Sequence, residues 1–161
     1  MVVAPNNFHH RCVDNIMADT MSRTTSSTLG QIHALLAAKR YSVTESGDSG
    51  LRILEVDSGI VIQAVLVGDI LFLSLPCISA PASSITPEVM RKMLASDNGI
   101  STSHFQLYET GDGNVAVTLN NFCKLQEMGP DDEDDVLSCV SFLLADVVRA
   151  KELIGGDLRS K

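Results

Sequence analysis

The chain has 161 residues, of which 45% are hydrophobic and 20% are charged, and this composition excludes a disordered chain. Its formal net charge is −8, which disfavours nucleic acid and anionic membrane surfaces as partners, because both are bound mainly by Lys and Arg. We therefore expect one globular domain with no nucleic-acid partner and no membrane.

The N-terminal part of the chain lacks a helical or strand period. We interpret 1–23 as a flexible tail, 24–156 as a single α+β domain and 157–161 as a C-terminal tail. The domain is expected to open with a helix that starts in a Ser/Thr-rich stretch and reaches about Tyr41. Its apolar residues recur at helical spacing: Leu29, Ile32, Leu35 and Leu36.

Three short apolar runs follow, separated by tight turns that contain Gly. They are Leu51–Val56, Ile60–Val67 and Ile70–Leu75, and Val43–Glu45 is a candidate edge strand before them. Turns this short predict antiparallel hairpins, since parallel strands need long crossovers. Pro76 is expected to end the third strand, and Ser79–Ile85 is expected to be a loop.

The second half of the chain predicts a helix, a hairpin and a longer helix. Thr86-Pro87-Glu88 has the residue types of a helix start, and Asn98-Gly99 is expected to end that helix. Phe105–Glu109 and Val115–Leu119 flank a Gly-rich turn. The last helix is expected over Asp131–Ile154, stopped by Gly155-Gly156, with an apolar stripe of Val136, Val140, Leu143, Val147 and Ile154, widened by Leu137, Leu144 and Val148.

The predicted order is therefore α-βββ-α-ββ-α, an antiparallel sheet with helices packed on it. Two clusters of acidic or metal-ligating residues have plainer interpretations than a metal site. The contiguous run Asp131–Asp135 lacks the alternation of a calcium loop and is better explained as anions at a helix N-terminus. His9, His10 and Cys12 lie in the predicted tail without a fourth ligand nearby. We expect no metal and no cofactor.

The sequence also lacks a recognisable catalytic motif: it has no GxSxG, no HExxH and no phosphate-binding loop. We therefore expect no catalytic residues and no enzyme activity. Its cysteines form no CxxC pair, and Cys77 and Cys139 are interpreted as small buried hydrophobic residues. The first residues do not form a signal peptide, so a cytoplasmic location with reduced thiols is expected.

The element order, the Pro87-opened middle helix that ends at Asn98-Gly99, and the hairpin Phe105–Leu119 before an acidic-capped helix resemble the class I type III secretion chaperone superfold, which YbjN-like proteins share. The resemblance covers about Thr24 to Ile154. It implies a homodimer without enzymatic activity. It also implies a partner protein that binds as an extended segment, by strand addition and by side chains in apolar pockets.

Carried onto this chain, the resemblance gives two sets of candidate site residues. The possible partner-binding residues are Ile32, Leu35, Leu36, Leu51 and Ile53, and the possible dimer contacts are Met90, Met93 and Leu94. Ordinary core packing is the alternative for both sets. A YbjN-like regulatory or accessory protein without a secretion role is the alternative function, and an enzyme or small-ligand binder is the third.

Overall fold

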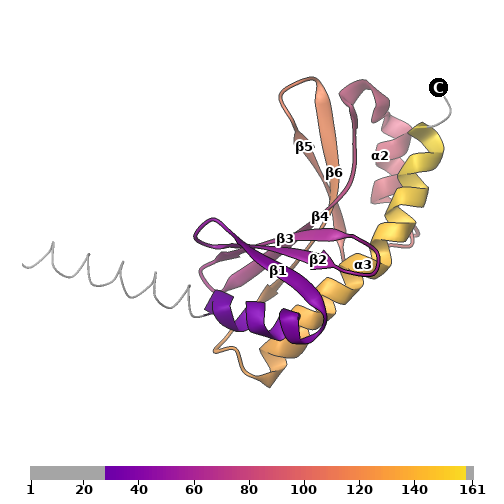
Figure 1. The fold of residues 1–161 in the computed structure, drawn as a ribbon. Coiled ribbons are helices and arrows are strands. Elements are labelled where there is room, and N and C mark those ends of the chain that lie inside the picture. The colour runs from indigo at the N-terminus through magenta and orange to yellow at the C-terminus, as the bar shows by residue number, and fades with distance from the viewer. Residues whose placement is uncertain (1–27, 159–161) are drawn as a thin grey trace, which may run out of the picture.

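The computed structural model describes residues 28–158 (Figure 1). The predicted N-terminal tail, with His9, His10 and Cys12, lies outside the described residues. Residues 28–38 form the N-terminal helix. The elements that follow are β1 (Tyr41–Ser46), β2 (Gly50–Glu55), β3 (Val61–Val67), β4 (Ile70–Pro81), the 3-10 turn η1 (Ala82–Ser84), α2 (Pro87–Leu94), β5 (His104–Glu109), β6 (Asn114–Lys124) and α3 (Pro130–Leu158).

The strands form one antiparallel sheet in the order β1-β2-β3-β4-β6-β5. The α+β fold class, the antiparallel pairing and the order of helices and strands are thereby confirmed. The candidate edge strand Val43–Glu45 is part of β1, which lies at one edge of the sheet, and β5 lies at the other edge. Both edges expose unpaired backbone N–H and C=O groups.

Strand β4 is longer than the sequence predicted. It continues past Pro76 to Pro81, so the predictions that Pro76 ends the strand and that Ser79–Ile85 is a loop are wrong over this stretch. Proline lacks an N–H for the ladder, which is why strands usually avoid it. Here the pairing with β6 shifts register between Pro76 and Ile78, and this β-bulge accommodates the proline and bends the strand.

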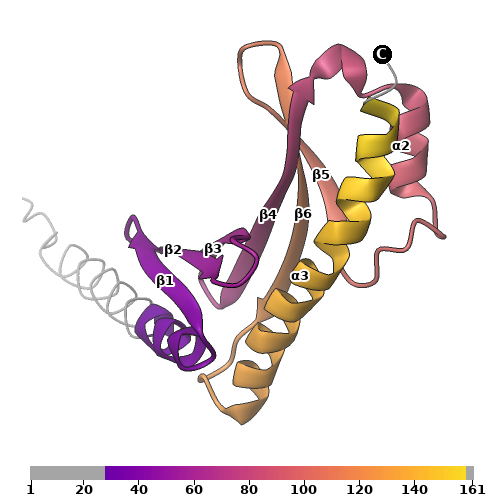
Figure 2. The same ribbon diagram turned by 45° about the vertical axis from the view of Figure 1, so that its right-hand side comes forward.

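One face of the sheet carries the core. The N-terminal helix and α3 both pack on it, as Figure 2 shows, and their buried side chains meet alternate residues of the central strands. Fully buried residues of this core include Ile32, Leu36, Leu51, Ile53, Leu71, Leu73, Leu119, Val136, Val140 and Leu143. The predicted stripe of the last helix, Val136 to Ile154, is thus buried as expected.

Helix α2 packs beside α3 at the far end of the sheet (Figure 1). Its first turn is capped as the sequence predicted, since the Thr86 hydroxyl accepts the backbone N–H of Val89 at 3.3 Å. The helix ends at Leu94, so the expectation that it extends to Asn98-Gly99 is wrong. Asn98 still serves the C-terminus, because its side-chain amide donates to the carbonyl of Met93 at 2.6 Å.

Helix α3 departs from the sequence prediction in two places. It continues through Gly155-Gly156 to Leu158, because two glycines cost only about 1 kcal/mol each in a helix and do not break it by themselves. Val148 was expected to widen the apolar stripe, but it is 59% exposed. Asp146, two residues earlier in the helix, is buried instead. Its carboxylate accepts the backbone N–H and the hydroxyl of Ser101.

Candidate functional site

The face of the sheet opposite the core carries no described helix (Figure 2). It is hollowed into a trough of about 440 Å³. We call this hollow the open-face trough. Its lining comes from β3, β4, β6 and β5, although β3 and β5 are not neighbours in the sheet. The lining residues are Gln63, Val65, Phe72, Leu73, Ser74, His104, Gln106, Tyr108, Asn120, Asn121 and Phe122.

The bend of the two long strands explains why the trough exists. Strands β4 and β6 run from the β1–β3 end of the sheet toward the β5–β6 hairpin and curve along the way (Figure 2). The bulge lies on β4 beside Pro76, which is paired with Thr118 of β6. Bulges bend and twist a strand locally. The outer side of β5 is therefore turned toward the outer side of β3.

Two buried polar residues of β6 lie on the open face: Asn120, which lines the trough, and Thr118, which is two residues before it on the same side of the strand. Thr118 is 6% exposed and Asn120 is 8% exposed, and the Asn120 side-chain amide donates to the Thr118 hydroxyl at 2.7 Å. A buried polar group is costly unless it is hydrogen-bonded, and this bond satisfies one donor of the amide. These two side chains are thus buried although no helix of residues 28–158 packs on this face.

One wall of the trough is polar and is built by β5. The hydroxyl of Tyr108 donates to the side-chain oxygen of Gln106, whose amide nitrogen lies 3.3 Å from Nε2 of His104. These residues alternate along the strand, so all three side chains project from the same face. They line the trough with a row of hydrogen-bonding groups.

The other wall is apolar. Phe72 of β4 and Phe122 of β6 are directly paired across the strands, with ring centroids 6.2 Å apart in a tilted arrangement. Phe72 is 45% exposed, Phe122 is 57% exposed, and Val65 beside them is also exposed. None of the lining residues is Asp, Glu, Lys or Arg, although the chain as a whole carries a net charge of −8. The trough is thus a neutral surface on an acidic protein.

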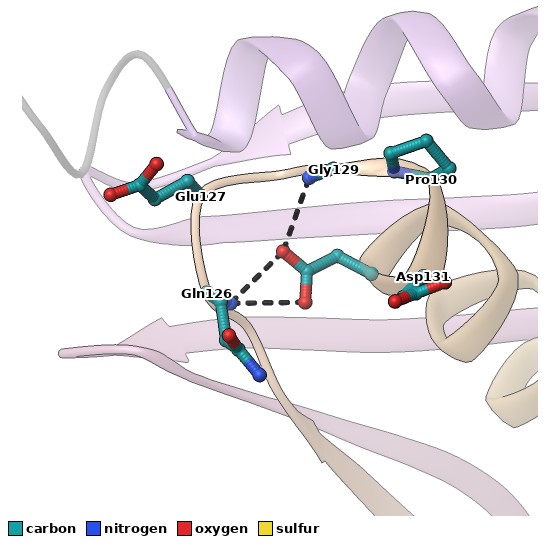
Figure 3. A pocket seen from close by; sticks show the side chains of 6 residues that line it. Gln126, Glu127, Gly129, Pro130 and Asp131 are labelled. Atoms are coloured by element: carbon teal, nitrogen blue, oxygen red, sulfur yellow. Dashed lines mark hydrogen bonds between the residues drawn. The ribbon is translucent and has the colours of Figure 1, made fainter.

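A second hollow lies at the loop between β6 and α3 and is lined by acidic and small residues (Figure 3). It is formed by Gln126, Glu127, Gly129, Pro130, Asp131 and Asp132. Asp132 is 5% exposed, and its carboxylate accepts the backbone N–H of Gln126 at 2.9 Å and that of Gly129 at 3.3 Å. Asp132 therefore holds the loop closed at the start of α3.

The acidic run at this helix start has more than one role. Asp131, Glu133, Asp134 and Asp135 are exposed, as expected for anions near a helix N-terminus, whereas Asp132 points into the loop. Over residues 28–158, the structure contains no cluster of three or more His, Cys, Asp or Glu residues arranged to hold a metal ion. None of the helices described in this range is both long enough and apolar enough to span a membrane.

The residues proposed from the sequence for partner binding are mostly inside the domain. Ile32, Leu36, Leu51 and Ile53 are at most 1% exposed in the core between the N-terminal helix and β2. Leu35 is partly buried against the same core. Their partner-binding role stays a prediction, and Leu35 is the member of the set with the most accessible surface.

The residues proposed as dimer contacts lie on two different sides of α2. Met93 is 4% exposed and packs with Val89 against β6 and α3, while Met90 is 36% exposed and Leu94 is 81% exposed. Met90 and Leu94 are four residues apart and therefore share the outer side of the helix. Their role in a dimer interface also stays a prediction.

Sequence reasoning did not find the open-face trough. One signal was present, because the run Ile70–Leu75 reads Ile-Leu-Phe-Leu-Ser-Leu and is apolar at positions that face both sides of the strand. The sequence does not show that β6 continues to Lys124, which is what brings Phe122 opposite Phe72. The site therefore depends on the pairing of two strands, β4 and β6, that are far apart in the sequence.

Comparisons with known proteins bear on the fold. No family model and no curated protein sequence matches the chain. Among solved structures, it is similar to the crystal structure of YbjN from E. coli, a protein proposed to regulate transcription. The two superpose with a TM-score of 0.54 at 14% sequence identity, over 78% of this chain and 87% of YbjN. The chain has the YbjN-like fold. At this identity the likeness confirms the arrangement of elements that the sequence suggested.

Proposed function

We propose that this protein is a cytoplasmic, non-enzymatic binding module that holds an extended segment of a partner protein in the open-face trough. The observation that carries the proposal is an uncovered, concave sheet face with a neutral lining of aromatic and amide side chains. An exposed apolar surface that contributes little to the fold commonly marks a binding site for another protein.

The lining suits an extended polypeptide. Phe72, Phe122 and Val65 offer apolar contacts for side chains on one side of the segment. Gln106 and Asn120 offer amide donors and acceptors for its backbone, which in an extended chain is not satisfied by internal hydrogen bonds. The adjacent edge strand β5 has unpaired backbone groups that can add a further strand.

The charge distribution of the protein limits which partner segments can bind in the trough. A neutral trough does not stabilise a charged side chain that loses its water on binding. The surrounding protein is acidic and repels acidic partners at longer range. The expected partner segment is therefore apolar and uncharged where it lies in the trough, with neutral or basic flanking residues.

We further propose that the protein is a homodimer. The outer side of α2 presents Met90 and Leu94, and an apolar pair at this spacing is well suited to packing against a second helix. A two-fold contact through α2 would use the same patch on both copies, as the commonest closed assemblies do.

A YbjN-like regulatory or accessory protein without a secretion role is the second candidate function. The observation that favours it is the fold shared with YbjN, which has itself been proposed to regulate transcription. Both candidates act by contact with another macromolecule. The identity of the bound segment separates them, because a secretion chaperone binds an exported protein and a regulatory protein binds another class of partner.

The trough can be tested with a display library of unstructured peptides selected on the purified full-length protein. We expect enrichment of apolar, uncharged sequences. A labelled peptide from the selection should lose at least about tenfold in affinity, measured by fluorescence anisotropy, when Phe72→Ser and Phe122→Ser are combined. The matched control is Val148→Ser, which changes a residue of similar exposure on α3 and should bind normally.

Unchanged affinity of the Phe72→Ser, Phe122→Ser protein, with its fold intact by circular dichroism, would place binding elsewhere. Sedimentation velocity on the same samples tests the dimer. Met90→Glu combined with Leu94→Glu should give monomers, because like charges would face each other across the two-fold contact. Val67→Glu, at an exposed position of β3, is the control. A monomeric unmodified protein contradicts the dimer proposal.

A further inference from the structure

Two cysteines meet at the interface between β6 and α3. Cys123 of β6 is 7% exposed, Cys139 of α3 is 9% exposed, and both belong to the same core cluster. The two residues are brought together where helix α3 packs on strand β6. The Cys139 thiol donates to the carbonyl oxygen of Phe122 at 3.6 Å, and this carbonyl belongs to the peptide bond that leads into Cys123, so the Cys139 sulfur lies beside Cys123. The third described cysteine, Cys77, hydrogen-bonds instead to its own strand, at the carbonyl of Leu75.

The contact makes the two thiols unequal. Hydrogen bonding by the neighbouring Cys123 thiol lowers the pKa of Cys139, against the opposing effects of burial and of the Asp135 charge. The same bond raises the pKa of Cys123, and burial and the nearby carboxylates raise it further. Cys139 is thus the thiol of the pair that ionises first, and a thiolate is the nucleophilic form of cysteine. By contrast, burial raises the pKa of Cys77 to about 11, which leaves that thiol unreactive.

We propose that Cys123 and Cys139 are a redox modification site, which a peroxide converts into a disulfide that links strand β6 to helix α3. The Cys139 thiolate attacks one oxygen of hydrogen peroxide, so that an S–O bond forms, the O–O bond breaks and hydroxide leaves. The Cys123 sulfur then attacks the Cys139 sulfenic acid. An S–S bond forms, the S–O bond breaks, and the departing hydroxide takes the proton of the Cys123 thiol as water.

Both thiols are thereby oxidised together by two electrons, and the peroxide is reduced to two molecules of water. The arrangement fits this chemistry because Cys139 lies against the backbone next to Cys123 in the same buried cluster, and a thiol nearby favours the disulfide over further oxidation of Cys139. Helix α3 packs directly on β6, so the new bond joins elements that are already in contact. A thiol reductant reverses the change.

The expected consequence is a stabilised connection between β6 and α3. A disulfide between Cys123 and Cys139 closes a chain segment that includes the loop held by Asp132. Cross-links of this kind restrict the unfolded chain and raise the melting temperature when the native geometry accommodates them. Oxidised protein should therefore melt at a higher temperature than reduced protein, and dithiothreitol should remove the difference.

The test uses the full-length protein treated with hydrogen peroxide, alkylated under non-reducing conditions and digested with trypsin. Cleavage after Lys124 separates Cys123 from Cys139, and cleavage after Arg91 and Lys92 separates both from Cys77. We expect a linked pair of peptides containing Cys123 and Cys139, with the loss of two hydrogen atoms. The link should form faster in folded protein than in protein unfolded in guanidinium chloride.

Two variants sharpen the result. Cys77→Ser should leave the link unchanged. Cys123→Ser removes the second thiol, and its Cys139 should gain oxygen as sulfenic and then sulfinic acid. The proposal is overturned if the Cys123 and Cys139 peptides remain unlinked when another cysteine has been oxidised. It is also overturned if either residue pairs mainly with Cys77 or Cys12, or if folding does not accelerate the link.

Discussion

The two faces of the sheet are built from the same strands, but one face packs in the core and the other remains exposed. On the covered face, Leu73 and Leu119 are at most 1% exposed beneath helix α3. On the open face, their neighbours along and across the strands include Phe72 and Phe122, which are about half exposed. Apolar area stabilises the fold only where it is removed from water, at roughly 25 cal/mol per Å². The open face therefore keeps apolar surface that folding does not use, and this surface remains available for a partner.

The sharpest test of this contrast uses adjacent residues of β4. Leu73→Ala should destabilise the domain by about 2–5 kcal/mol, because it removes buried methyl groups and leaves a cavity in the core. Phe72→Ala should cost less, although it deletes a larger side chain, because Phe72 is 45% exposed. Urea unfolding monitored by circular dichroism measures both. Equal losses would mean that the open face is already covered, for example by a second copy.

A smaller loss of stability is expected at the buried polar pair Thr118 and Asn120, beside the open-face trough. Thr118→Val keeps the shape of the side chain but removes the hydroxyl that accepts the amide of Asn120. A buried donor without its partner costs about 1–3 kcal/mol. Thr44→Val, at an exposed position of β1, is the matched control and should change stability by less than about 0.5 kcal/mol. If both variants unfold at the same urea concentration, water reaches the Asn120 amide freely and the Thr118 hydroxyl adds no stability.

The smallest effect on stability is expected in the turn between β5 and β6, which belongs to neither face of the sheet. Hydrogen bonds from the Thr110 hydroxyl and from Asn114 lower the pKa of Asp112. Because the folded-state pKa is the lower one, these bonds add stability above the unfolded-state pKa, and the contribution is lost as the pH falls through the folded-state value.

Removing the Thr110 hydroxyl should reverse part of the lowering of the Asp112 pKa. Thr110→Val is expected to raise the pKa of Asp112 toward its ordinary value, and carboxyl NMR chemical shifts followed against pH measure it. The Thr44→Val protein supplies the comparison curve. An unchanged Asp112 titration would show that the turn is held without the Thr110 hydroxyl.

Local sequence patterns by themselves determined the helices, the tight turns and the order of elements in this protein. Helical spacing predicted the buried stripe of α3, and the Thr86-Pro87 start of α2 was predicted by its capping residue and fixed proline φ. Tight turns with Gly predicted antiparallel hairpins, and the resulting order of elements agrees with the YbjN-like fold. These features depend on residues close together in the chain, so their physical causes can be read from the sequence.

Tertiary structure decided the rest. The extension of β4 past Pro76 depends on a bulge against β6, and the ends of α2 and α3 depend on what packs beside them. The pairing of Phe72 with Phe122 and the packing of Cys139 beside Cys123 each join different elements of the fold. Whether a side chain faces core or solvent is set by neighbours that only the folded chain supplies, because a strand presents both faces equally until a helix covers one of them.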